Sequence, residues 1–153
     1  MNRYETDYYA WAHEQATLLT EGRWNELDLD HLIEELEQMA DSAPGELYNR
    51  LIILLAHLLK LQVAAAVLPG VYERAQRGWT LSCAEQRRRL DRLRRRNPSL
   101  EPTLPDEMAE AYQVARLQCL AALGVDDSQV PDVCPWEQAQ VLMDGWYPGE
   151  TVP

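Results

Sequence analysis

The sequence lacks the features of several protein classes. Its three cysteines, Cys83, Cys119 and Cys134, are widely separated and form no Cys-x-x-Cys pair, which excludes a disulfide framework and a standard zinc-knuckle spacing and suits a reducing cytosol. No apolar run approaches the roughly 18 residues that span a bilayer. The first residues lead directly into acidic sequence rather than into a signal peptide. We therefore expect a cytoplasmic protein with no membrane partner.

The motifs of common enzymes are also missing. The chain has no Gly-rich phosphate loop, no G-x-S-x-G nucleophile elbow and no H-E-x-x-H zinc motif. We assign no catalytic residue and no metal-ligand set, and we expect no cofactor. These absences favour a binding protein over an enzyme.

Lysine is nearly absent, whereas arginine is concentrated in one place. The chain has 14 basic residues, of which only Lys60 is a lysine, and its net charge is −11. Residues 85–97 contain seven arginines and two acidic residues, and the segments on both sides are strongly acidic. Acidity of the whole chain repels nucleic acid at long range, which disfavours a protein that coats DNA non-specifically.

What is present is the composition of a globular helical domain. Its 153 residues are 46% hydrophobic and 25% charged, and they show helical rather than alternating periodicity. We predict an all-α, single-domain helical bundle of about five to six helices over residues 1–153, with residues 147–153 as a mobile tail. The predicted helices cover about residues 7–21, 28–43, 45–68, 82–97 and 105–123, and a short one follows Pro135 and stops at Gly145.

Local signals define these helices. Thr6 is a candidate cap for the first, and Pro44 marks a restart between the second and the third. Residues 71–79 are predicted to be a connector, after which Ser82-x-x-Glu85 resembles a capping box. The second helix has the clearest amphipathic pattern and the third is apolar on all sides, so we expect the third to be central. The apolar face of the second helix comprises Leu29, Leu32, Ile33, Leu36, Met39, Ala40 and Ala43.

The arginine-rich helix is the first candidate site. Arg88, Arg92, Arg95 and Arg96 share a stripe at helical spacing. Three interpretations are open: a solvated face paired with the chain's own carboxylates, a surface for a protein partner, or a site for phosphate, RNA or DNA. The absence of interleaved aromatic residues weakens the nucleic-acid interpretation.

His57 is the centre of the second candidate site, because it lies within the apolar helix, where a polar ring needs a partner. Glu34, Glu35 or Asp7 on a neighbouring helix are candidate partners. The structural interpretation is a satisfied core histidine, and the functional one is a metal or small-ligand site between helices. Carboxylate-bridged metal bundles use Glu-x-x-His on two helices, whereas His31-x-x-Glu34 has the reverse order and no second copy.

Several segments of the chain, in order, resemble one bacterial family. They are residues 4–11, 14–16, 27–29, 32–37, 49–51 and 57–62, followed by Trp79, residues 85–87 and 98–100, and Pro131-x-x-Cys134-Pro135-Trp136. The sequence is similar to the family called domain of unknown function 29 over nearly its whole length. The resemblance implies an all-helical cytoplasmic protein of mainly bacterial, especially cyanobacterial, distribution, and it supplies no activity. Leu61 replaces an aromatic residue that is usual in this family.

These observations lead to one main hypothesis and two alternatives. The main hypothesis is a small cytoplasmic helical protein that binds a macromolecular partner, a protein or a second copy of itself, through the arginine-rich helix. The alternatives are a metal or small-ligand site around His57, and RNA or DNA binding through the arginines.

Overall fold

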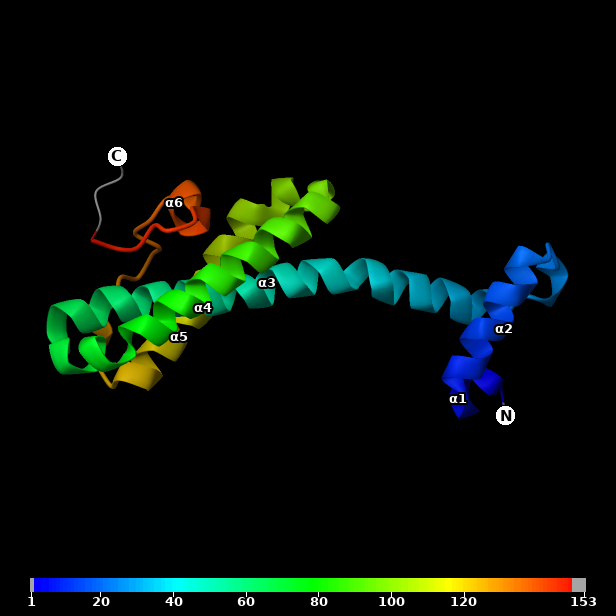
Figure 1. Ribbon diagram of the computed structural model, residues 1–153, viewed down its shortest axis with the longest axis horizontal. Coiled ribbons are helices and arrows are strands. Elements are labelled where there is room, and N and C mark those ends of the chain that lie inside the picture. Colours follow the sequence, from blue (N-terminus) through cyan, green and yellow to red (C-terminus); the bar gives the residue numbers. More distant parts are fainter. Residues whose placement is uncertain (1, 150–153) are drawn as a thin grey trace. The chain divides into compact units, whose positions relative to one another are not determined.

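The computed structural model describes residues 2–149, and in that range it contains helices and loops but no strand (Figure 1). The predicted all-α helical fold is therefore confirmed. Short 3₁₀ helices cover Trp24–Glu26, Pro98–Thr103 and Asp127–Gln129. The α-helices are α1 (Arg3–Thr6), α2 (Tyr8–Thr20), α3 (Leu29–Val67), α4 (Pro69–Arg96), α5 (Leu104–Leu123) and α6 (Gln138–Leu142).

The chain divides into two compact units, an N-terminal unit, Met1–Ser42, and a C-terminal unit, Ala43–Pro153. The boundary falls within α3, so this helix contributes to both units. The single-domain organisation stays a prediction. Of the predicted mobile tail, residues 150–153 lie outside the described residues, whereas the Tyr147 hydroxyl donates to the carbonyl oxygen of Thr80 at 3.1 Å.

Two consecutive caps organise the start of the N-terminal unit. The side chain of Asn2 accepts from the Tyr4 amide and caps α1, and Asp7 accepts from the Ala10 amide at 3.0 Å and caps α2. Thr6 lies inside α1, so its prediction as the cap of the first long helix is wrong. A carboxylate is an equally good cap, and Asp7 stands directly before the helix that it starts. The predicted stop at Gly22 is confirmed by its left-handed φ of 70°.

The predicted break between the second and third helices does not occur. Helix α3 continues through Pro44. A proline inside a helix removes one main-chain donor, and next to it the Ser42 hydroxyl donates to the carbonyl oxygen of Met39 at 2.7 Å. Pro44 is therefore accommodated in the interior of α3 and not at the first turn of a new helix.

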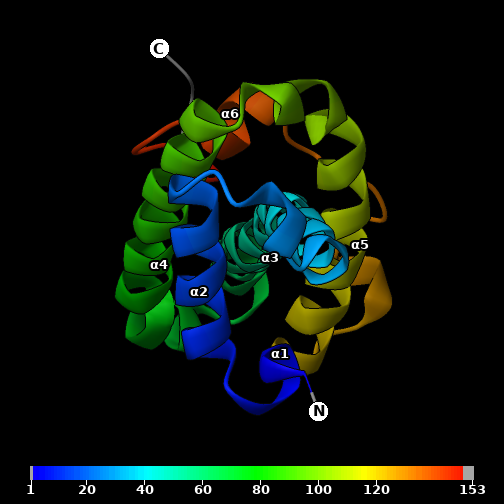
Figure 2. The same cartoon turned by 90° about the vertical axis from the view of Figure 1, so that its right-hand side faces the viewer.

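The C-terminal half of α3 is the core of the C-terminal unit, as the sequence predicts. Leu51, Leu54, Leu55, Leu58 and Leu59 are completely buried. Figure 2 looks along α3 and shows α4 and α5 on opposite sides of this half. Their buried residues, including Leu90 on α4 and Tyr112 on α5, belong to the same core cluster. Burial on all sides explains why this half of the helix has no polar stripe.

Helix α4 begins earlier than predicted. It starts at Pro69, so residues 71–79 are helical rather than a connector, and Ser82 lies in the helix interior rather than at a cap. Proline suits the first helical position because its missing N–H has no helical acceptor there. Ser and Glu three residues apart are also neighbours in a continuous helix, so the capping-box spacing alone does not identify a helix start. The predicted end of this helix at Asn97 is confirmed.

Helix α3 is also the one helix of the described residues that is long and apolar enough, by length and composition, to cross a membrane. The sequence alone indicated no such segment. Half of its most apolar window is buried inside the fold, and core helices of soluble proteins meet the same criterion.

Candidate functional sites

Arginine side chains of α4 line a cleft of about 560 Å³ in the C-terminal unit. We call this cleft the arginine groove. Arg88, Arg92 and Arg96 lie four residues apart, so about one helical turn separates each from the next. The remaining lining residues are Glu46, Glu85, Arg89 and Leu93.

The arginines of α4 differ in their partners. Arg89 pairs with Glu85 at 2.8 Å, Arg94 with Glu101 at 2.7 Å and Arg95 with Asp91 at 2.9 Å. The hydrogen bond from Arg89 holds the pKa of Glu85 below its ordinary value. Arg88, Arg92 and Arg96 form no ion pair with any residue of the described range, 2–149. The groove therefore combines one internally paired arginine with three unpaired ones.

The structure brings together three of the four arginines singled out in the sequence. Arg88, Arg92 and Arg96 line the groove, whereas Arg95 is bound to Asp91 and does not line it. Glu46 lies on α3, and the contribution of another helix to the lining is not visible in the periodicity of α4. Arg89 lies on α4 but outside the stripe identified from the sequence.

Arg87 is the buried arginine of this helix. Its Nε donates to the carbonyl oxygen of Val141 at 2.9 Å, and its guanidinium carbon lies 5.3 Å from the centroid of the Tyr147 ring. Its two Nη atoms are buried and have no hydrogen-bond partner among the described residues. Burial lowers the pKa of Arg87, and its place in the core separates it from the groove.

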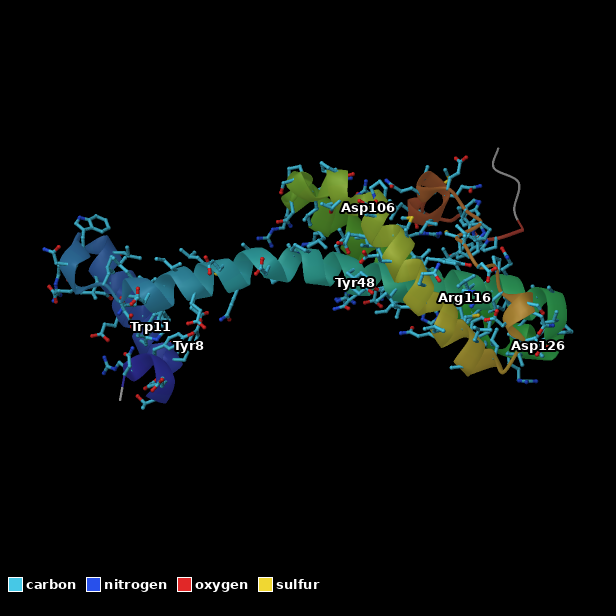
Figure 3. All side chains as sticks on the ribbon, turned by 180° about the vertical axis from the view of Figure 1, so that it is seen from behind. Tyr8, Trp11, Tyr48, Asp106, Arg116 and Asp126 are labelled. Carbon is cyan, nitrogen blue, oxygen red and sulfur yellow. The ribbon has the colours of Figure 1, made fainter. Side chains whose placement is uncertain are left out.

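A second polar cluster lies in the N-terminal unit, around two carboxylates of the segment that begins α3. The hydroxyls of Tyr4 and Tyr8 each donate to one oxygen of Glu35 at 2.6 Å. These two bonds, that from Tyr4 first, lower the pKa of Glu35. In return, the bond to Glu35 raises the pKa of Tyr4 to about 12 and also raises that of Tyr8. Figure 3 shows Tyr8 on α2 in this unit.

Asp28, the residue before α3, is the other carboxylate of the cluster. The indole N–H of Trp11 donates to it at 3.0 Å, Nδ1 of His31 lies 2.8 Å from it, and Asn2 donates to it at 3.2 Å. Desolvation acts to raise the pKa of Asp28, and the three side-chain hydrogen bonds lower it overall. The side-chain oxygen of Gln15 accepts from the Asp28 amide at 2.8 Å. These bonds fasten α1 and α2 to the first turn of α3.

His57 and the three carboxylates predicted to surround it belong to different units. Glu35 accepts from the two tyrosines, Asp7 caps α2, and Glu34 accepts from Gln38, all in the N-terminal unit. His57 belongs to the C-terminal unit, and its Nδ1 is buried with no hydrogen-bond partner in the described part of the chain. Burial together with Lys60 lowers its pKa. Desolvation therefore favours the neutral imidazole. The shared site stays a prediction.

Metal ligands do not gather anywhere in the part of the chain that the structure describes. No group of three or more His, Cys, Asp or Glu side chains in residues 2–149 is arranged to hold a metal ion. Asp28, His31 and Glu35 are engaged with Asn2, Tyr4, Tyr8 and Trp11 instead.

The comparison with known families agrees with the sequence resemblance. The family model named domain of unknown function DUF29 matches residues 3–147. The chain belongs to the DUF29 family. No curated protein and no solved structure matches it. In this DUF29 chain, the match covers both the cluster around Glu35 and the arginine groove.

The bond between Tyr4 and Glu35 gives a measurable titration. We expect Glu35→Gln to lower the pKa of Tyr4 from about 12 towards the ordinary value of about 10. The carboxylate of Glu35 disfavours the negatively charged tyrosinate, whereas a neutral amide does so less. The stabilisation from this bond is fully present between the ordinary pKa of glutamate, about 4.3, and that of tyrosine, about 10. It is lost as the pH falls through the lowered pKa of Glu35 or rises through the raised pKa of Tyr4. Nuclear magnetic resonance of labelled tyrosine ring carbons measures the shift, and Tyr4→Phe identifies the resonance. An unchanged Tyr4 titration in Glu35→Gln contradicts the contact.

Proposed function

We propose that this protein binds an acidic segment of a partner protein in the arginine groove. The observation that carries the proposal is that Arg88, Arg92 and Arg96 line one cleft and form no ion pair within residues 2–149. A guanidinium binds a carboxylate with two parallel hydrogen bonds. Three unpaired guanidinium groups, one turn apart, therefore suit a segment with several aspartate or glutamate side chains.

The charge of the whole chain supports oriented docking at this groove. The net charge is −11, so the groove is a local positive patch within a negative field. Such a patch favours the correct orientation of an acidic partner more than it adds to affinity. The long arginine stems also provide apolar surface beside their charged ends, together with Leu93 at the base of the groove.

A protein ligand fits the lining better than a nucleic acid. The lining contains no aromatic side chain on which a base stacks. Glu46 and Glu85 also lie in it. Their carboxylates repel any anionic ligand, but they accept hydrogen bonds from the N–H groups of a peptide main chain, which a phosphate backbone lacks. Binding to RNA or DNA is therefore the alternative that the test must separate.

The test measures binding of a fluorescent oligoglutamate peptide to the full chain by anisotropy, beside an RNA oligonucleotide of equal charge. We expect the peptide to bind more tightly, and we expect the double variant Arg88→Glu/Arg92→Glu to weaken it at least about 10-fold, because each reversal replaces an attraction by a repulsion. Arg95→Glu is the matched control: it changes charge on the same helix, outside the groove, so its expected effect is below about 2-fold.

Two outcomes contradict this function. Equal loss in Arg95→Glu and in the groove variant shows that only overall charge attracts the peptide. Tighter binding of the RNA, with the same dependence on Arg88 and Arg92, shows that the groove serves nucleic acid. If neither outcome is observed, a pull-down from the host with and without nuclease treatment identifies the partner.

A further inference from the structure

The N-terminal half of α3 has an apolar face that the fold leaves exposed. Leu29, Ile33, Leu36 and Met39 are 53–69% exposed, although the sequence pattern identifies this face as the most regular in the chain. The leucines of the other half of the same helix, from Leu51 onwards, are completely buried. We call the exposed residues, together with Leu32, the α3 face.

The spacing of the α3 face is that of a helix–helix contact. Leu29, Leu32, Leu36 and Met39 follow one another at intervals of three, four and three residues. This is the a/d pattern of a coiled-coil seam, whose side chains insert between those of a second helix. A single helix laid along the face therefore covers all of it.

One edge of the α3 face is acidic. At about 100° per residue, Asp30, Glu34, Glu37 and Asp41 lie together beside Ile33. Asp30, Glu37 and Asp41 form no ion pair with any residue in the described range 2–149, and Glu34 accepts only from Gln38. The opposite edge is occupied, because Glu35 there binds Tyr4 and Tyr8.

We propose that the α3 face docks an amphipathic helix of a partner protein whose apolar stripe is flanked by lysine or arginine. The apolar stripe of such a helix covers the face, and its basic flank pairs with the acidic edge. This inference goes beyond the arginine groove, because it concerns the other unit and a ligand of opposite charge.

Charge complementarity decides between this occupant and two others. In an antiparallel pair of α3 faces one acidic edge meets the other, and like charges across a helix pair specify against it. In a parallel pair the acidic edge meets the edge at which Glu35 already binds Tyr4 and Tyr8. An anionic membrane surface is repelled by the acidic edge. The arginines of α4 in a second copy do not supply the required stripe, because the apolar residues Leu90 and Leu93 of that helix are buried.

The experiment titrates the full chain with a synthetic helical peptide of about 18 residues that has leucine at its a and d positions and lysine beside them. A matched peptide has glutamate in place of lysine. We expect the basic peptide to bind, the acidic peptide to bind at least about 10-fold more weakly, and the double variant Leu36→Glu/Met39→Glu to lose at least about 10-fold in affinity for the basic peptide.

Two further variants keep the test independent of folding and of net charge. Glu37→Lys/Asp41→Lys changes only exposed residues of the acidic edge. Because Asp30 and Glu34 remain, the edge becomes neutral, and we expect the preference between the two peptides to be largely lost. Leu81→Glu adds a charge at an exposed leucine of the C-terminal unit, and we expect it to leave binding unchanged. Circular dichroism verifies that each variant keeps its helix content.

Four results overturn the proposal. The first is unchanged affinity of Leu36→Glu/Met39→Glu for the basic peptide, which shows attraction by net charge alone. The second is unchanged peptide preference in Glu37→Lys/Asp41→Lys. The third is a dimer of the wild-type chain, seen by light scattering, that Leu36→Glu/Met39→Glu dissociates. The fourth is binding of the wild-type chain to anionic vesicles that the same variant abolishes. Because Arg88→Glu/Arg92→Glu leaves the α3 face intact, failure here is distinguishable from failure of the arginine groove.

Discussion

Arg116→Met is expected to release the segment at residues 126–132 from α5. The guanidinium of Arg116 donates to three main-chain carbonyl oxygens of that segment, those of Asp127 at 2.9 Å, Val130 at 3.1 Å and Pro131 at 3.0 Å. It also pairs with the carboxylate of Asp127 at 2.8 Å. Figure 3 shows Arg116 on α5 and Asp126 at the start of the segment.

The physical reason is that methionine matches the stem of arginine but provides none of its donors. The segment has almost no regular structure of its own beyond Asp127–Gln129, and buried carbonyl oxygens without a donor are costly. The Tyr112 hydroxyl still donates to the Pro131 carbonyl oxygen at 2.6 Å, but the other two carbonyls lose their contact with α5. Local opening therefore becomes much easier than unfolding of the core.

Native-state hydrogen exchange measures this release. We expect the amides of residues 126–132 to exchange at least about 10-fold faster in Arg116→Met, while those of α3 remain protected. Arg95→Met is the control, because Arg95 is exposed and forms one surface ion pair with Asp91. Equal exchange of the segment in wild type and Arg116→Met would show that its other contacts, including the hydrogen bonds from Tyr112 and Gln113, hold it without Arg116.

The buried role of Arg116 had a signal in the sequence that periodicity alone did not interpret. It lies four residues after Tyr112 and three before Cys119, which places the three on one face of α5, and both of these residues are buried. An arginine on such a face needs acceptors in the interior. The acceptors are main-chain oxygens of an irregular segment, and no residue pattern specifies where those oxygens point.

In the polar cluster of the N-terminal unit, too, the sequence pattern did not specify which side chains form hydrogen bonds with each other. Glu35 was a candidate site residue in the sequence, but with His57 as its expected hydrogen-bond partner. The observed partners, Tyr4 and Tyr8, lie 31 and 27 residues away along the chain. The sequence did not predict these partners, because periodicity describes which face of a helix is apolar and not which hydroxyl reaches which carboxylate.

For helix α3, the sequence pattern predicted the helical structure but not what covers its apolar face. Periodicity correctly located helical structure in both halves, and the all-apolar character of the second half correctly indicated a central helix. The amphipathic pattern of the first half predicted an apolar face but not its cover. An apolar face has the same pattern whether its cover belongs to the same chain or to a partner.

The two halves of α3 therefore respond differently to the same substitution. We expect Leu55→Ala to destabilise the C-terminal unit by about 2–5 kcal/mol, because Leu55 is completely buried and its loss leaves a cavity. Leu36→Ala, at a side chain 63% exposed, is expected to change stability by less than about 0.5 kcal/mol. Urea denaturation followed by circular dichroism compares the two variants.

A large effect of Leu36→Ala is the informative contradiction. Alanine has a higher helix propensity than leucine, so a loss of stability similar to that of Leu55→Ala can arise only if Leu36 is covered in the free chain. The α3 face would then be part of a core, and no partner helix would be needed to cover it. A small effect on stability, together with a large effect of Leu36→Glu/Met39→Glu on peptide binding, assigns this face to recognition rather than to folding.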